Sequence, residues 1–140
     1  MKQSRVKNIH GLGQSIWLDF FDRKIMDSGE LKKLIDNDGI SGVTSNPSIF
    51  ENAISSSLDY DDDIASLSQK KISTEEIFFA LAVKDIQRAT GFFKPIYEKT
   101  KGNDGFVSLE VYPLLAHDTD GTIKQARELW RAMNRKNAMI

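Results

Sequence analysis

Short apolar runs alternate along the chain with longer stretches in which apolar residues recur every three or four positions. The short runs are typical of β-strands, and they lie at 15–19, 42–45, 106–111 and 137–140. Helical spacing predicts helices or helical turns at 22–26, 29–36, 48–54, 59–69, 73–100 and 119–133. The alternation of strand and helix, repeated three times before a fourth strand, indicates βαβ units and a parallel sheet.

Polar residues at fixed positions predict where several helices begin. Ser73 and Glu76 have the spacing of a capping box, so the long helix is expected to begin there. Asn46-Pro47 predicts a strand end and a helix start together, because Asn is a good N-cap and Pro is tolerated at the first helical position. His117-Asp118 is interpreted as a loop histidine followed by a helix N-cap rather than part of a metal site or a catalytic triad.

Two helices are expected to bury one apolar face each. The face of the long helix comprises Phe79, Ala82, Ile86, Ala89, Phe93 and Ile96. The face of the last helix comprises Ile123, Ala126, Trp130 and Met133.

Composition narrows the classes of protein to consider. The 140 residues include no cysteine, which excludes a disulfide scaffold, a thiolate metal site and a cysteine nucleophile. A formal net charge of -1 argues against nucleic acid or an anionic membrane as the main partner. The apolar runs are too short to span a bilayer and no secretory signal is evident, so we expect a cytoplasmic protein. We expect one domain over 1–140, with a polar N-terminal arm at 1–14.

Candidate chemistry lies at the carboxyl ends of the predicted strands, where parallel β/α proteins place their sites. Both a doubly wound sheet and an eight-stranded barrel fit the alternation of elements. Asp19 ends the first strand, Asn46 follows the second, and Glu110 lies near the end of the third. Period-2 geometry places Ser108 and Glu110 on one face, opposite Val107, Leu109 and Val111. Converging polar groups suit a small, hydroxyl-rich substrate, with two carboxylates for proton transfer.

Each candidate also has a structural explanation. Asp19 is explained equally well as a residue that caps the following helix. Asn46 is explained as an N-cap, a role that is compatible with ligand contact. For Glu110 a functional role is the favoured interpretation, because burying a carboxylate within a β-strand costs free energy unless the group has a function.

Three segments of the sequence resemble the N-terminal part of a transaldolase, most closely the longer bacterial branch of that family. They are GQSIWLD at 13–19, GISGVTSNPSIF at 39–50, and VSLEV at 107–111 followed by LAHDT at 115–119. The resemblance implies the N-terminal portion, about three to four β/α units, of a (β/α)8 TIM barrel of the α/β class. It also implies a pentose phosphate pathway enzyme that moves a dihydroxyacetone unit from sedoheptulose 7-phosphate to glyceraldehyde 3-phosphate. No metal or other cofactor is implied.

The resemblance assigns roles to the candidate residues. Asp19 is similar to the acid/base that handles the substrate hydroxyl proton, and Glu110 to the acid/base that acts through a water during carbinolamine formation. Asn46 resembles the residue that orients the substrate, and Thr44 and Ser45 are expected to line the same strand end.

Relatives carry the Schiff-base lysine on the fourth strand, directly after a stretch like that at 137–140. No lysine of this chain fits that role, so the 140 residues alone are expected to be inactive. Two alternatives stay open: a sugar-phosphate aldolase of the same fold, and a non-catalytic half-barrel. A half-barrel leaves open sheet edges and an apolar face, which favour association with itself or with the missing C-terminal part.

Overall fold

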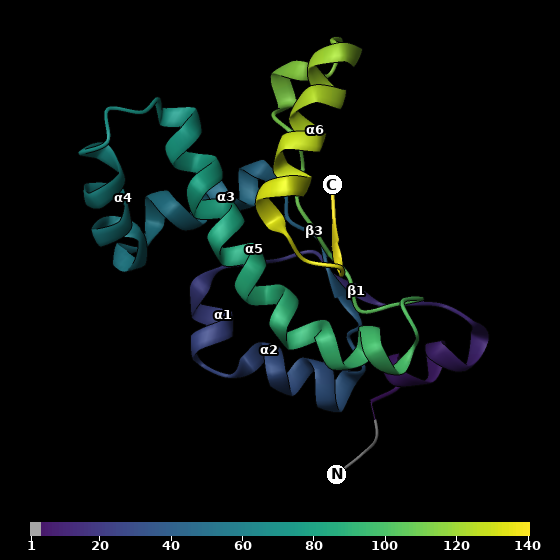
Figure 1. The fold of residues 1–140 in the computed structure, drawn as a ribbon. Helices are drawn as coiled ribbons and strands as arrows, with labels where there is room; N and C mark the ends of the chain where they lie inside the picture. The colour runs from purple at the N-terminus through teal and green to yellow at the C-terminus, as the bar shows by residue number, and fades with distance from the viewer. Residues whose placement is uncertain (1–3) are drawn as a thin grey trace.

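The sheet of the computed structural model, which describes residues 4–140, has four parallel strands in the order β1-β2-β3-β4 (Figure 1). The strands are β1 (Trp17–Leu18), β2 (Gly42–Val43), β3 (Val107–Ser108) and β4 (Ala138–Met139). Each strand pairs in parallel with the next one along the chain. This order, with a helical connection between consecutive strands, confirms the predicted βαβ organisation.

The helices fill the connections between the strands. They are α1 (Arg23–Asp27), α2 (Glu30–Lys33), α3 (Pro47–Ser56), α4 (Asp61–Ser68), α5 (Thr74–Lys99) and α6 (Thr119–Met133), with a π-helical turn at Leu34–Asp38 and 3₁₀ turns at Val6–Leu12, Leu58–Tyr60 and Pro113–Leu115. The long α5 crosses the middle of the molecule, and α4 lies beside one end of it, away from the strands (Figure 1).

The hydrogen-bonded ladders are shorter than the extended segments predicted from the sequence. Backbone bonds nevertheless continue beyond the two-residue ladders, from Ser41 N to Ile16 O at 2.8 Å and from Thr44 N to Leu18 O at 2.9 Å. On the third segment, Leu109 N donates to Met139 O at 2.9 Å. The predicted extended segments are therefore present, and the assigned strands cover only two residues of each.

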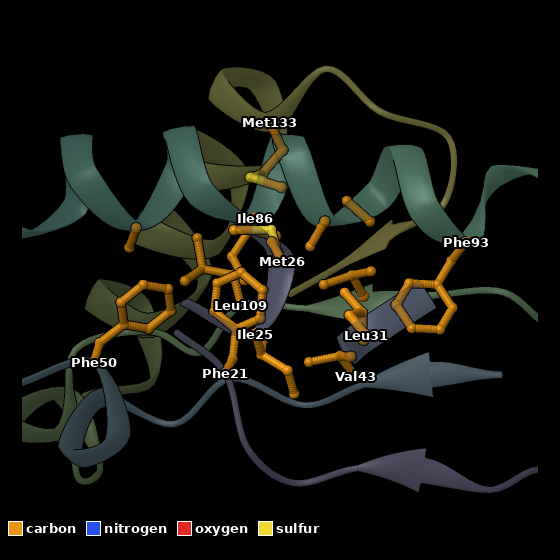
Figure 2. Close-up of a cluster of buried hydrophobic side chains, with 14 of the residues drawn as sticks. Phe21, Ile25, Met26, Leu31, Val43, Phe50, Ile86, Phe93, Leu109 and Met133 are labelled. Carbon is orange, nitrogen blue, oxygen red and sulfur yellow. The ribbon is translucent and has the colours of Figure 1, made fainter. Parts of the chain in front are cut away.

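The core lies between the strands and the helices that cover one face of the sheet (Figure 2). Ile86 and Phe93 of α5 point toward the strands and are fully buried, as are Val43 and Val107 in β2 and β3. Ala82 and Ala89 are also fully buried, which confirms the predicted face of the long helix. Large apolar groups removed from water on this face hold the helices on the sheet.

The prediction for the last helix was partly wrong. Met133 is buried as expected, but Ile123 is 44% exposed and Trp130 is 51% exposed. Leu129, which the predicted face left out, is buried instead. The helix turns Leu129 and Met133 toward the core, and Ile123 and Trp130, seven residues apart, form a second stripe that faces away from it.

The predicted helix starts are present. Ser73 and Glu76 form both hydrogen bonds of the capping box at the start of α5. Asp118 caps α6 by accepting from Gly121 N at 2.9 Å. Asp22 caps α1, where its Oδ1 accepts from Ile25 N at 2.7 Å. The first helical turn after β1 is thus capped by Asp22 and not by Asp19, so the capping explanation for Asp19 is wrong.

Of the expected N-terminal arm at 1–14, residues 1–3 lie outside the described residues. Residues 6–12 form a 3₁₀ helix that contacts the π-helical turn before β2. Lys7 Nζ donates to Asp36 O at 3.0 Å, and the ring of His10 hydrogen-bonds Gly39 O. This segment is therefore attached to the body of the molecule by contacts that the sequence did not suggest.

Candidate active site

The strand register places four of the candidate side chains, Asp19, Thr44, Asn46 and Glu110, on the face of the sheet opposite the core. Leu18, Val43 and Val107 are aligned and lie on the core side. One residue further along, Asp19, Thr44 and Ser108 form a row on the opposite face, because side chains alternate along a strand. Asn46 and Glu110 lie on that face two residues later, roughly 6–7 Å further in the strand direction.

Trp17 and Gly42 lie on the same face, two residues before Asp19 and Thr44 in their strands. The two residues are paired in the register, and a Cβ on Gly42 would lie 2.5 Å from Cδ2 of the Trp17 indole. Only glycine leaves room for the ring at this position. The indole therefore packs on the β2 backbone at Gly42, two residues before Thr44.

Asp19 and Thr44 are in direct contact. Thr44 Oγ1 donates to Asp19 Oδ1 at 2.6 Å, which fixes one carboxylate oxygen of Asp19. Asp19 is exposed, and none of the ion pairs within residues 4–140 involves it. Its second oxygen is thus available to accept a proton from a bound molecule.

Asn46 performs the predicted capping role and keeps a free donor. Its Oδ1 accepts from Ser48 N at 2.8 Å at the start of α3. Within the described residues, its Nδ2 makes no hydrogen bond. An amide has two donors on this nitrogen, so the cap and a ligand contact are compatible.

Glu110 and Ser45 differ from expectation. Glu110 is exposed, so the argument that its burial would be costly was wrong, because the β3 ladder ends at Ser108 and this face is uncovered in residues 4–140. Its position beyond β3, on the same face as Ser108, agrees with the predicted alternation. Ser45 is 1% exposed and its Oγ donates to Ser108 O at 2.6 Å, so its hydroxyl proton is directed at β3 and not at the open face.

The helix side of the molecule contains a partly buried ionic cluster that the sequence did not predict. Arg23 of α1 donates through Nε to both carboxylate oxygens of Asp85 on α5, at 2.9 and 3.0 Å. Its other nitrogens donate to Asp63 Oδ2 of α4 at 2.7 Å and to Asp59 O at 2.6 Å. Lys84 adds a second cation on Asp63. A charged residue at position 85, between Ala82 and Ala89 on the apolar face of α5, was the available indication of a buried partner.

Charges and burial in this cluster shift several pKa values. The hydrogen bond from Lys84 lowers the pKa of Asp63, and Arg23 adds to that effect. Burial raises the pKa of Asp85, against the opposing effect of Arg23. Burial also raises the pKa of the Tyr60 phenol well above its ordinary value, and the guanidinium carbon of Arg23 lies 4.2 Å from the centre of that ring. The cluster therefore joins α1, α4 and α5, and of its charges those of Arg23 and Asp85 are largely withdrawn from water.

Comparisons with known proteins assign the family. Residues 16–140 match the family described as Transaldolase/Fructose-6-phosphate aldolase. The chain belongs to this family. It is 47% identical over 134 residues to a transaldolase of Thiobacillus denitrificans and 46% identical over 140 residues to one of Trichodesmium erythraeum. A transaldolase of Saccharopolyspora erythraea is 43% identical over 137 residues.

These alignments cover 96%, 100% and 98% of this chain but 37% of each of the three relatives. The chain thus spans little more than a third of the length of the curated proteins it matches. The family fold is a TIM barrel, and the four parallel strands with their helices are a part of such a barrel.

Two further observations concern membrane-spanning helices and metal sites. Across residues 4–140, no helix is both long and apolar enough to cross a membrane. In the same part of the chain, no three His, Asp or Glu side chains are grouped as a metal site requires.

Proposed function

We propose that this chain supplies one side of the active site of a transaldolase. The complete enzyme would move a dihydroxyacetone unit from sedoheptulose 7-phosphate to glyceraldehyde 3-phosphate in the pentose phosphate pathway. The observation that carries the proposal is the strand register, which aligns Asp19, Thr44, Asn46 and Glu110 on one face at the carboxyl ends of three parallel strands. Family membership and the name shared by the relatives support it. We also propose a cytoplasmic location, in keeping with the absence of cysteine.

In the proposed reaction, the amine of a lysine in a segment that follows Ile140 attacks the donor ketone and forms a protonated imine with loss of water. Glu110 acts through a water as the acid and base of that step. Asp19 accepts the hydroxyl proton of the donor as the C–C bond breaks and the bonding electrons move into the imine. The cleaved aldehyde leaves, the acceptor aldehyde takes up the three-carbon unit, and Asp19 returns the proton to the new hydroxyl. Water then hydrolyses the imine, which releases the product ketose and restores the lysine amine.

The contacts at the strand ends support these assignments. Thr44 donates to one carboxylate oxygen of Asp19, and the other has no hydrogen-bond partner in the described part of the chain, as a proton acceptor requires. Asn46 Nδ2 makes no hydrogen bond within residues 4–140, which supports a role as donor to a substrate hydroxyl, and side-chain alternation puts Asn46 in the same layer as Glu110. Asp19 and Glu110 lie on either side of β2, on strands roughly 9–10 Å apart, a span comparable to a sugar phosphate lying over the end of β2.

A hybrid protein tests this proposal. Residues 1–140 of this chain are joined to the part of the Thiobacillus denitrificans transaldolase that follows its matched segment, and the unjoined chain serves as control. We expect the hybrid to transfer the three-carbon unit and to form a borohydride-stable adduct with the ketose phosphate, and the control to form none. A hybrid that folds cooperatively but transfers nothing contradicts the proposal.

A sugar-phosphate aldolase is the second candidate, because the family description names both activities. The two differ in the fate of the three-carbon unit, which an aldolase releases and a transaldolase passes to an aldehyde. Product analysis of the hybrid with and without glyceraldehyde 3-phosphate separates them. Release of dihydroxyacetone at the same rate without the acceptor would favour the aldolase.

We further propose that the β4 edge pairs with the C-terminal part of the barrel, or otherwise with a second copy of this chain. Trp130, Met139 and Ile140 are 51%, 44% and 38% exposed beside this edge, which has no neighbouring strand within residues 4–140. Open edges and exposed apolar groups favour association. Sedimentation at increasing concentration checks this, and a stable monomer at high concentration contradicts self-association.

A further inference from the structure

The hydroxyl of Ser45 links β2 to β3 at the point where both segments reach the candidate site. Val43 N donates to Phe106 O at 3.2 Å in the backbone ladder. Two residues further along both segments, the donor is a side chain, because Ser45 Oγ donates to Ser108 O at 2.6 Å. The Ser45 side chain thus continues the connection between the segments beyond Val43, where β2 ends.

This link is adjacent to two of the proposed active-site residues. Ser45 directly precedes Asn46, and Ser108 lies two residues before Glu110. Ser45 is 1% exposed, and a hydrogen bond withdrawn from water is stronger than an exposed one. The bond therefore fixes the backbone that carries Asn46 against the backbone that carries Glu110.

We propose that Ser45 is a positioning residue, which sets the separation between the Asn46 amide and the Glu110 carboxylate without touching the substrate. The inference rests on the proposed function and replaces the substrate-lining role that the family resemblance implied for Ser45. A hydroxyl has one proton to donate, and Ser45 gives it to Ser108 O on the side away from the open face. Thr44 differs, since its hydroxyl contacts the Asp19 carboxylate itself.

The same strand provides a matched control. Ser41 is 2% exposed, and its Oγ donates to Ile16 O at 3.3 Å. It is likewise a buried hydroxyl that donates to a neighbouring carbonyl, at the opposite end of β2, but that carbonyl also accepts from Ser41 N at 2.8 Å and so keeps a partner when the hydroxyl is removed. Ser41→Ala removes a hydroxyl of equal size far from the strand ends that carry the site.

The first measurement uses the 140-residue chain itself. Amide hydrogen exchange is followed by NMR in Ser45→Ala and Ser41→Ala. We expect Ser45→Ala to accelerate exchange at Leu109, whose N–H donates to Met139 O, by about tenfold, the effect of losing one typical buried hydrogen bond. Exchange at Val107, which donates to Asn137 O, should stay unchanged in both variants. Equal exchange at Leu109 in the two variants overturns the inference.

The second measurement uses the hybrid protein. We expect Ser45→Ala to lower kcat by about tenfold to a hundredfold with little change in KM, since a displacement of about 1 Å at a reacting group has effects of this size. Borohydride trapping should show slower imine formation, the step assigned to Glu110, whereas Ser41→Ala should match the parent. Ser45→Thr keeps the donor and should recover part of the loss.

The outcomes separate the two proposals. If the parent hybrid is active and Ser45→Ala equals Ser41→Ala in kcat and trapping rate, the positioning role is wrong and the proposed function stands. If the parent hybrid folds but is inactive, the proposed function is wrong, and the exchange rate at Leu109 alone decides whether Ser45 orders the end of β3. Thermal unfolding of each variant distinguishes these results from a general loss of structure.

Discussion

The strand ends and the helix-side ionic cluster each bring acidic side chains together, but they leave them in different states. In the cluster, Arg23 donates to both carboxylate oxygens of Asp85 and also to Asp63. Both carboxylates therefore have a cation as partner, and the Arg23 and Asp85 side chains are only 12% and 4% exposed. At the strand ends, Asp19 and Glu110 are exposed, and within residues 4–140 no cation pairs with either. Carboxylates that are already paired with cations suit a structural role, whereas exposed carboxylates without an ion pair suit proton transfer.

The largest effect is expected from neutralising the strand-end carboxylates in the hybrid protein. Asp19→Asn and Glu110→Gln each keep the shape of the side chain and remove the proton acceptor. We expect kcat to fall about 10²-fold to 10⁴-fold, the usual contribution of a general acid or base. The free energy of unfolding should change by less than about 0.5 kcal/mol, because both side chains are exposed. A large loss of stability with retained activity would show that these carboxylates are structural and would contradict the assigned roles.

Breaking the helix-side cluster should affect stability instead. Arg23→Met leaves Asp85 buried without its partner, which we expect to lower the free energy of unfolding by about 3–5 kcal/mol. Arg88→Met is the matched control, since Arg88 pairs with Asp27 at the surface. Urea unfolding of the two variants provides the measurement. Similar losses in both would show that the burial of the Arg23 pair has no special effect.

The pH dependence of stability should reflect Asp63. Its folded-state pKa is lowered by Lys84 and Arg23, so its contribution is present above the unfolded value near 3.8 and is lost as the pH falls through the lower folded-state value. Asp85 acts in the opposite sense, because burial raises its pKa and acidification therefore favours the folded state at that group.

Urea unfolding between about pH 5 and about pH 2 checks the sign. Asp63→Asn should lose less stability on acidification than the parent chain. A steeper acid loss in Asp63→Asn than in the parent would contradict the assigned direction.

The smallest effect is expected from the exposed member of the cluster. Lys84 pairs with Asp63, but its side chain is 62% exposed. Lys84→Gln should therefore lower the free energy of unfolding by no more than about 1 kcal/mol, as for other surface ion pairs. Comparison with Arg23→Met in the same urea experiment measures how much burial strengthens a pair that shares the Asp63 carboxylate.

Local signals in the sequence predicted much of the fold. The alternation of runs predicted the four strands and their order along the chain, and Ser73 with Glu76 predicted the start of α5. These features depend on residues close together in the sequence, so they can be recognised without the tertiary structure. The burial of Leu129 in place of Trp130 was not predictable in this way, because the two residues are adjacent, large and apolar, and only packing selects between them.

The candidate site shows the same division. Period-2 alternation placed Glu110 on the face opposite Leu109, and the Asn46-Pro47 step predicted the cap of α3. The direct contact between Thr44 and Asp19 depends on the register of two strands joined by more than twenty residues. No local pattern specifies that register.

The sequence by itself determined the class of fold, the family resemblance and the side of each strand on which the polar residues lie. These follow from periodicity and from motifs that are continuous in the chain. Only the tertiary structure decided that Ser45 donates to β3, that one oxygen of Asp19 has no hydrogen-bond partner within residues 4–140, and that Arg23 joins three helices. Each of these depends on hydrogen bonds between residues distant in sequence, whose partners are selected when the core packs and excludes water.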